Sequence, residues 1–234
     1  MLNLGSSDFY FAVPTLPREE LEAYSSKLFD IWEAQIDHEL PLEDYSLSLE
    51  IEEGSIQGSG KVMAHLVAVG LFISHYGSIV QGLQTMSSHV TMAGEYLTKK
   101  AHVFLGPDTP APVVRKRNGT LGQIQRLFIK VQRREMTAEE AFAEAEKILG
   151  AEAASAPDFM QHLNKSLQEA PLQAQQLFLA PDGDMSEPAE RAPMKRSRPR
   201  PSNHVPAIPE MNQFRVEVWR ESKRGKKQIR ITAI

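Results

Sequence analysis

The chain has 234 residues, a formal net charge of −4, no cysteine and 41% apolar residues. This length fits one domain with or without a small extension, and the lack of cysteine excludes disulfide frameworks, thiolate metal sites and cysteine nucleophiles. The charge is uneven, because residues 191–234 carry twelve Lys/Arg against three Asp/Glu, whereas residues 1–190 carry fourteen against twenty-seven. Either the basic end folds back on the acidic body, or it binds an external polyanion.

The first part of the chain predicts a helix and a hairpin. The N-terminal stretch has no Lys or Arg before Arg18 and no sustained apolar core, so we expect no signal peptide and a cytoplasmic protein. Residues 18–40 have apolar side chains at helical spacing between Pro17 and Pro41, which predicts an amphipathic helix. The stretch YSLSLEIEE (45–53) alternates, as a half-buried strand does, and 56–62 can return as its hairpin partner.

The glycine-rich stretch at 54–61 (GSIQGSGK) has the outline of a phosphate-binding loop. Such a loop needs Gly, four residues, Gly-Lys and then Ser or Thr, because backbone N–H groups hold the phosphates and the hydroxyl binds magnesium. Ser55 stands where the first glycine belongs, and Val62 stands where the hydroxyl belongs. We therefore favour a hairpin turn that leads into a helix. A nucleotide-binding enzyme with a degenerate loop here, or an accessory component of a multi-gene system, is an alternative.

The run from Val62 to Gly94 contains no Asp, Glu, Lys or Arg. The first part of this run is the most apolar stretch of the chain. We expect a helix over about 64–104, with breaks near Gly77 and Gly94. Three interpretations are open: a core helix, a self-association helix, or a membrane-associated segment at 62–85. The length argues against a membrane span, because a span needs about 20 apolar residues. Small residues at every fourth position let helices approach closely, and the candidates for self-association or helix packing are Gly70, Ser74, Ser78 and Gly82.

The middle of the chain predicts a helical bundle. A loop at 106–112 precedes expected helices at 120–134, 137–150, 155–170 and 171–179, with capping boxes at Thr120/Gln123 and Thr137/Glu140. The basic run at 115–134 followed by a second helix suggests a helix-turn-helix motif, in which the second helix enters DNA. That second helix is acidic here, so we favour a packed helical hairpin.

The C-terminal region predicts a linker and a basic ribbon. Residues 181–212 are rich in proline and polar residues, which is typical of a flexible linker. Two strands within 214–232 flank a basic turn, and Trp219 is placed to stack on a base. Because an isolated hairpin is marginally stable, we expect it to dock on the 45–62 hairpin or on a partner subunit. The candidate polyanion-binding residues are Lys195, Arg196, Arg198, Arg200, Trp219, Lys223, Arg224, Lys226 and Lys227.

No catalytic arrangement is evident in the sequence. HExxH and Gly-x-Ser-x-Gly motifs are absent, and His65, His75 and His89 have no carboxylate near them in the uncharged run, so we expect no catalytic residues, no metal and no cofactor. The expected fold is α+β and mostly helical, with a body at 1–180, a linker at 181–212 and a basic β-hairpin arm at 213–234. We interpret the chain as a non-enzymatic binding or assembly protein that forms a homo-oligomer or holds a protein partner through its helical body. Its basic arm contacts a polyanion, nucleic acid being one candidate.

Overall fold

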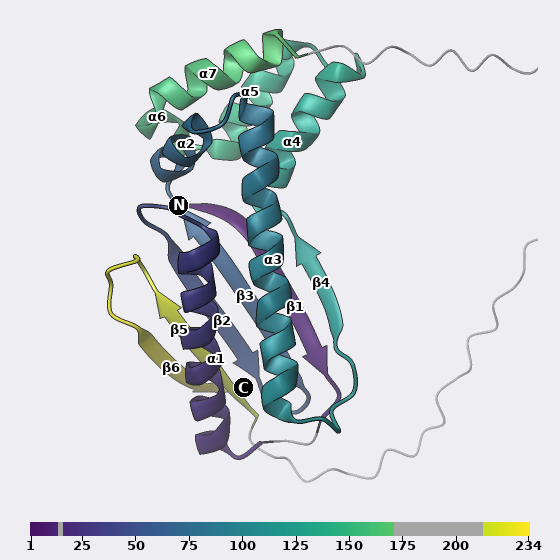
Figure 1. Cartoon of the computed structure of the whole chain (residues 1–234), viewed down its shortest axis with the longest axis vertical. Helices are drawn as coiled ribbons and strands as arrows, with labels where there is room; N and C mark the ends of the chain where they lie inside the picture. Colours follow the sequence, from purple (N-terminus) through teal and green to yellow (C-terminus); the bar gives the residue numbers. More distant parts are fainter. Residues whose placement is uncertain (14–15, 171–212) are drawn as a thin grey trace, which may run out of the picture. The chain divides into compact units, whose positions relative to one another are not determined.

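The centre of the fold is a six-stranded antiparallel sheet with the strand order β4-β1-β3-β2-β5-β6 (Figure 1). The computed structural model describes residues 1–13, 16–170 and 213–234, and the expected linker at 181–212 and helix at 171–179 lie outside them. The described strands are β1 (Leu2–Phe11), β2 (Ser46–Glu52), β3 (Ile56–Ala64), β4 (Val113–Arg117), β5 (Phe214–Arg220) and β6 (Gln228–Ala233). The described helices are α1 (Arg18–Glu39), α2 (Leu66–Ser74), α3 (Ile79–Leu105), α4 (Gly119–Gln132), α5 (Ala138–Leu149), α6 (Ala151–Ser155) and α7 (Pro157–Gln168). The α+β, mostly helical class is confirmed.

Two interleaved β-α-β units build the first four strands of the sheet. β3 lies between β1 and β2, and β1 lies between β3 and β4, so each helix crossover connects strands that are separated by one other strand. This is the ferredoxin-like, or split βαβ, arrangement. The β5–β6 ribbon extends it beyond β2. Many unrelated functions occur on this arrangement, so it identifies a scaffold and not an activity.

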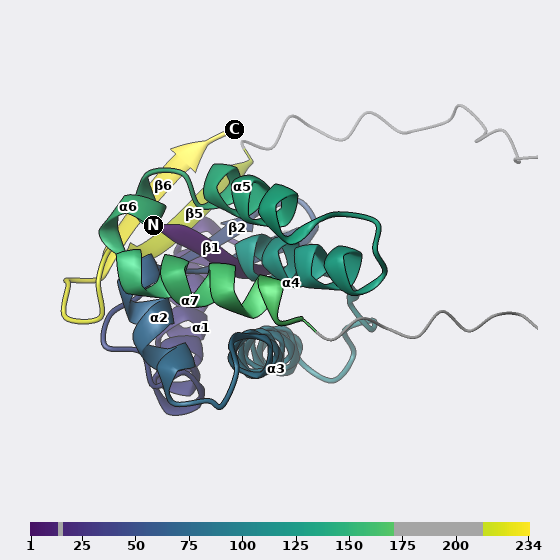
Figure 2. The same cartoon turned by 90° about the horizontal axis from the view of Figure 1, so that it is seen from above.

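Helices α1 and α3 pack on the same face of the sheet (Figure 2). The alternation in β2 explains this one-sided burial, since Leu47, Leu49 and Ile51 are completely buried and the residues between them point to the other face. Two glycines of β3 make room for side chains packed on this face, one from β1 and one from α3. A methyl group at Gly58 would overlap the ring of Phe9, and one at Gly60 would overlap Leu97 of α3.

The expected long helix is two helices. α2 and α3 meet at 112° around residues 75–78, so the break near Gly77 is confirmed, whereas α3 continues through Gly94. Because of the bend, the predicted row of small residues does not form one helix face: Gly70 lies on α2 against Phe159, and Gly82 lies on α3 against Ile73. No single helix of the described residues is long and apolar enough to cross a membrane. The bent pair of α2 and α3 taken together has sufficient length and apolar composition, which is an argument from length and composition alone.

Two expectations need correction, and one is confirmed. β1 and β4 were not predicted, and they add two strands to the expected hairpin. α4 begins at Gly119, after Asn118, so the Thr120/Gln123 capping box is wrong, because Thr120 already lies inside the helix. The box of α5 is confirmed, with the Thr137 hydroxyl accepting from the Glu140 N–H at 3.2 Å and the Glu140 carboxylate accepting from the Thr137 N–H at 2.9 Å.

The remaining helices, α4 to α7, pack together with α2 at one end of the sheet (Figures 1 and 2). Glu152 of α6 fixes the start of α2, because it accepts a hydrogen bond from the Leu66 N–H at 2.9 Å and contacts the His65 ring at 3.1 Å. Hydrogen bonds from the Met1 amino group, Leu66 and His65 hold the pKa of Glu152 at about 2. α2 is therefore anchored at its N-terminal end.

Substitution of the β3 glycines tests the close packing on the buried face of the sheet. Gly58→Ala and Gly60→Ala are expected to lower the free energy of unfolding by about 1–3 kcal/mol, because each methyl group meets a packed side chain. Gly77→Ala is the control, since nothing lies within 4 Å of its added methyl group. Urea unfolding measures the effect; unchanged midpoints for both β3 variants would contradict the proposed packing.

Candidate functional site

The basic ribbon is part of the sheet and is tied to α1 by three ion pairs. β5 pairs with β2 along Leu47–Glu52, so the ribbon docks on the expected hairpin. The ion pairs join Lys227 to Asp30 at 2.6 Å, Arg220 to Glu33 at 2.6 Å and Lys223 to Asp37 at 3.0 Å. The three acids lie along one face of α1, at spacings of three and four residues. The expected separate arm at 213–234 is therefore an edge of the body.

Burial gives these ion pairs different electrostatics. Burial raises the pKa of Glu33 above its usual value, and the opposing effect of Arg220 does not cancel this increase. Burial acts in the same direction on Asp37, but hydrogen bonds from the Tyr45 hydroxyl, at 2.6 Å, and from Lys223 outweigh it and lower the pKa. Glu33 therefore depends on its partner to remain charged, whereas Asp37 is held as a carboxylate by two donors.

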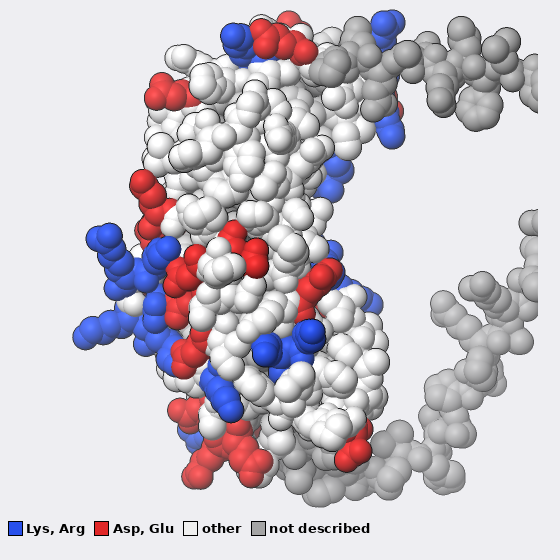
Figure 3. All heavy atoms as spheres, in the orientation of Figure 1, with Lys and Arg blue, Asp and Glu red and all other residues white. Residues whose placement is uncertain are grey.

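The candidate residues of the ribbon fall into two groups. Lys223 and Lys227 are used in the ion pairs with α1, and the Trp219 ring is half-buried with the Arg230 guanidinium 5.1 Å from its centre. Arg224 and Lys226 are exposed at the turn and pair with no residue that the structure describes. Figure 3 shows basic side chains gathered over the β5–β6 ribbon, with acidic side chains beside them over α1. Lys195, Arg196, Arg198 and Arg200 lie outside the described residues.

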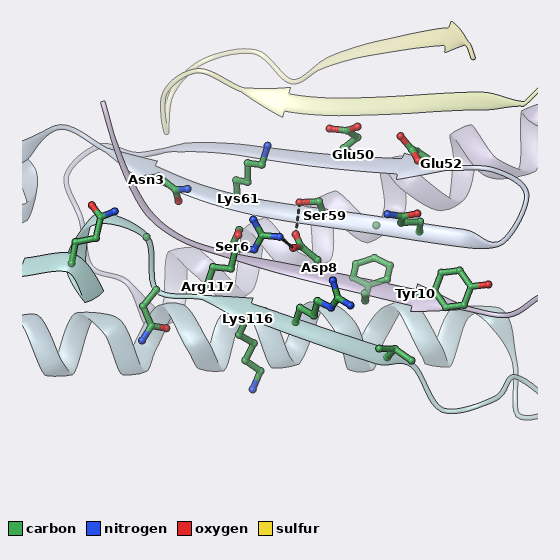
Figure 4. A pocket seen from close by; sticks show the side chains of 18 of the residues that line it. Asn3, Ser6, Asp8, Tyr10, Glu50, Glu52, Ser59, Lys61, Lys116 and Arg117 are labelled. Carbon is green, nitrogen blue, oxygen red and sulfur yellow. Dashed lines mark hydrogen bonds and ion pairs between the residues drawn. The ribbon is translucent and has the colours of Figure 1, made fainter. Parts of the chain in front are cut away.

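The face of the sheet opposite α1 and α3 carries polar side chains in rows across the strands. Strand register aligns three such rows, listed here in the strand order β4-β1-β3-β2-β5-β6. The first row is Arg117, Ser6, Lys61, Ser48, Trp219 and Gln228; the second is Arg115, Asp8, Ser59, Glu50, Glu217 and Arg230; the third is Val113, Tyr10, Gln57, Glu52, Arg215 and Thr232. Figure 4 shows the labelled members Arg117, Ser6, Lys61, Asp8, Ser59, Glu50, Tyr10 and Glu52 on β4, β1, β3 and β2. We call this surface the open face.

A hollow of about 1060 Å³ lies over the β4, β1, β3 and β2 side of the open face. Its floor consists of outward side chains from these strands, and α4 bounds one end through Gly119, Gln123 and Arg126. Gly119 has a φ of +51° and packs against the backbone of Asn3, so an amino acid with a side chain would be strained there. The chain therefore turns tightly from β4 into α4 and places Arg126 beside the sheet.

The β4, β1 and β3 half of the hollow has an excess of positive charge. Asp8 is the acid of this half; it accepts a hydrogen bond from Ser59 at 2.8 Å and lies 3.5 Å from Arg117. Lys61, Arg115 and Arg126 also line the hollow, are exposed, and form no ion pair within the described part of the chain. Lys116 lies on the opposite side of β4, where it pairs with Glu95 of α3. Four cations and one carboxylate thus line this half of the hollow.

The β2 side of the open face is internally neutralised. Arg215 of β5 pairs with Glu50 at 3.0 Å and also with Glu52, and these carboxylates raise its pKa. Arg230 pairs with Glu217 at 3.7 Å. A negatively charged ligand would therefore meet free cations only on the β4, β1 and β3 half.

The glycine-rich stretch is strand β3 after a turn at Gly54, and it does not form a phosphate-binding loop. Lys61 lies on the open face, where it is the neighbour of Ser6 on β1. Among the described residues, no group of three or more His, Asp or Glu side chains is placed to hold a metal. The open face therefore offers charge and hydrogen-bonding groups to a ligand.

A second hollow, of about 520 Å³, lies between α2 and α7. Gly70, Ser74 and Ser78 line it, so three of the four predicted small residues share one surface, while Gly82 is buried elsewhere. Val67 and Leu71 of α2 are each 45% exposed along the same hollow. We call this surface the α2–α7 groove; the surface around α2 carries few charged side chains (Figure 3).

Comparisons of the chain with protein-family models, with curated proteins and with solved structures found no match. The open face must therefore be interpreted from its own chemistry. Sequence reasoning identified Arg115, Arg117 and Arg126 as a basic run but assigned them to a helical hairpin. The alternation of Asp8, Phe9, Tyr10 and Phe11 is the signal that could have identified β1, and with it the open face.

Replacing Arg220 tests the docking of the ribbon. Arg220→Met is expected to lower the free energy of unfolding by roughly 1–3 kcal/mol, because it leaves the Glu33 carboxylate buried without its partner. The loss should shrink as the pH falls, since the already raised pKa of Glu33 rises further and a protonated carboxyl needs no counter-charge. Lys226→Met, in the same turn, is the control. Urea unfolding at several pH values between neutral and mildly acidic measures this difference in the free energy of unfolding. A loss that does not change with pH would contradict this role for Glu33.

Proposed function

We propose that the protein is a non-enzymatic binding protein that holds a polyanion in the hollow of the open face. The observation that carries the proposal is the group of four cations, Lys61, Arg115, Arg117 and Arg126, which line the hollow. Asp8 is the one acid on their β4, β1 and β3 half, while Glu50 and Glu52 line the β2 side, where they pair with Arg215. Such a group attracts phosphate or sulfate esters even when the net charge of the protein is negative, because the local potential governs encounter.

The hollow is a better candidate than the ribbon for the main contact. Lys223 and Lys227 already pair with acids of α1, so binding a polyanion through them would break existing ion pairs. Lys61, Arg115 and Arg126 would lose no ion pair with a described residue. Arg224 and Lys226 at the ribbon turn remain available for an additional contact.

Self-association is a second candidate function, and the α2–α7 groove favours it. Large exposed apolar side chains, Val67 and Leu71, border this groove, and no charged residue occurs between Val62 and Gly94. Depletion of charge is the compositional mark of an interface core. We propose a homo-oligomer in which α2 of one copy contacts the groove of another.

Removal of the hollow's cations tests polyanion binding. The double variant Arg115→Ala/Arg126→Ala is expected to weaken heparin binding about tenfold or more and to reduce the slope of log K against log salt by up to about two, because two counterion-releasing contacts are lost. Lys99→Ala/Lys100→Ala on α3 removes the same charge from the opposite side of the sheet and should have little effect. Fluorescence titrations at several salt concentrations measure both. Equal losses in the two double variants would overturn the site.

A charge in the α2–α7 groove tests self-association. Leu71→Asp is expected to convert an oligomer to a monomer, because an unpaired carboxylate in an apolar interface is costly. Val103→Asp is the control, since Val103 on α3 is 60% exposed and does not line the groove. Light scattering during size-exclusion chromatography, with and without detergent, measures the mass. A monomeric wild-type protein would contradict self-association, and a wild-type mass that changes only with detergent would favour the membrane-associated alternative.

A further inference from the structure

We propose that the polyanion held by the open face is a single-stranded nucleic acid, with Tyr10 as the side chain on which a base stacks. This inference rests on the polyanion-binding function proposed above and names the class of its ligand. It is motivated by a combination of three chemistries in one hollow: cations, an exposed aromatic ring, and neutral hydrogen-bonding groups.

The aromatic ring is Tyr10 of β1, which lines the hollow and is 40% exposed. Its neighbours along the chain, Phe9 and Phe11, point to the helix side and are buried in the core, so the strand alternation fixes the Tyr10 ring on the open face (Figure 4). Exposure of a large ring has no benefit for packing, and a base can cover it without any rearrangement of the core. Base–aromatic stacking contributes about 1–3 kcal/mol per base.

The cations stand where the backbone of a stacked nucleotide would lie. Tyr10 pairs with Val113 of β4, and Arg115 is two residues further along that strand, which makes it a diagonal neighbour on the same face. Diagonal neighbours lie about 7–8 Å apart, within reach of long side chains. Arg117 and Lys61 continue the positive charge along β4 and β3, and Arg126 continues it to α4. A chain of phosphates can therefore follow β4 while a base turns toward Tyr10.

The neutral groups distinguish this hollow from a purely electrostatic surface. Ser6, Ser59 and Gln57 form the floor, and Asn3, Asn118 and Gln123 line the end near α4. Amide and hydroxyl groups can donate to and accept from the edges of unpaired bases. Heparin or a phosphate cluster needs only cations. Glu50 and Glu52 border the other side of the hollow and would repel phosphates, which confines the backbone to the β4 side.

A single strand fits this arrangement better than a duplex. In a duplex the bases stack on one another, so their faces are not available to Tyr10. In a single strand, the faces and the edges of the bases are both accessible, and all three chemistries of the hollow are used at once. RNA and DNA share this chemistry, and the experiment separates them.

Fluorescence anisotropy of the full chain tests the inference. The probes are labelled oligouridylate, oligothymidylate and a mixed-sequence duplex, each of about twelve nucleotides. Both single strands are expected to bind more tightly than the duplex at equal salt, with the tighter of the two identifying RNA or DNA. Tyr10→Leu should weaken single-strand binding by about 5- to 150-fold and leave heparin binding unchanged, because it removes a ring and no charge.

Two further variants control for the ring. Tyr10→Phe keeps the stacking surface and should retain single-strand affinity. Tyr96→Leu removes a ring beside Lys100 on α3, on the other side of the sheet, and should also have no effect.

The outcomes separate this inference from the function on which it rests. If duplex, single strands and heparin bind alike and Tyr10→Leu has no effect, while Arg115→Ala/Arg126→Ala weakens all of them, the polyanion site stands and the nucleic-acid inference is overturned. If no polyanion binds, or if binding ignores the cations of the hollow, the proposed function itself fails. The inference is supported if single strands bind more tightly than the duplex, and if Tyr10→Leu weakens single-strand binding while Tyr10→Phe and Tyr96→Leu do not.

Discussion

Burial of one face of the sheet is the constraint on which the rest of the structure depends. α1 and α3 both cover the side formed by residues such as Leu47, Leu49 and Ile51. The glycines at 58 and 60 make room on this side for the Phe9 ring of β1 and for Leu97 of α3. Because side chains alternate along a strand, the residue next to each buried position points to the opposite face of the sheet. Those residues form a largely polar surface that crosses six strands. The open face is therefore a direct consequence of how the core is made.

Ion pairing then determines which charges on this scaffold remain available. The ribbon's Arg220, Lys223 and Lys227 are matched by three acids of α1, and Arg215 is matched by two acids of β2. These pairs attach β5 and β6 to the sheet and neutralise much of the positive charge of the ribbon. Free positive charge is left on β3, β4 and α4, far from the ribbon in sequence. The charge balance of residues 191–234 points to the C-terminal region, whereas the pairing points to the hollow.

Local patterns in the sequence predicted much of the fold but little of the candidate site. The alternation of 45–53, the apolar spacing of 18–40 and the Thr137/Glu140 box depend on neighbouring residues, and they give β2, α1 and α5 correctly. β1 was missed because Gly5 interrupts its alternation with a register shift, and β4 because three of its five residues are basic and all five are exposed. The site arises where these two strands meet β3, and such a meeting depends on long-range pairing that no local pattern records. The bend angle between α2 and α3 is a similar case, since the two helices pack on each other across it, with Gly82 against Ile73.

The two proposed surfaces also make different demands on the chain. The α2 wall of the α2–α7 groove is apolar, whereas α7 contributes charged side chains such as Asp158 and Lys165. Contact there gains from burial of Val67 and Leu71, an effect that salt does not weaken. The open face is polar and charged, so its affinity must fall as salt displaces the ligand. Because α4 packs against β1 and also against α5, which contacts α7, the helical end holds Arg126 at the edge of the hollow while it forms the groove. The groove and the hollow of the open face share no lining residue, so oligomerisation through the groove would bring several open faces into one particle. A long polyanion could then engage more than one of them, with a gain in affinity that no single site provides.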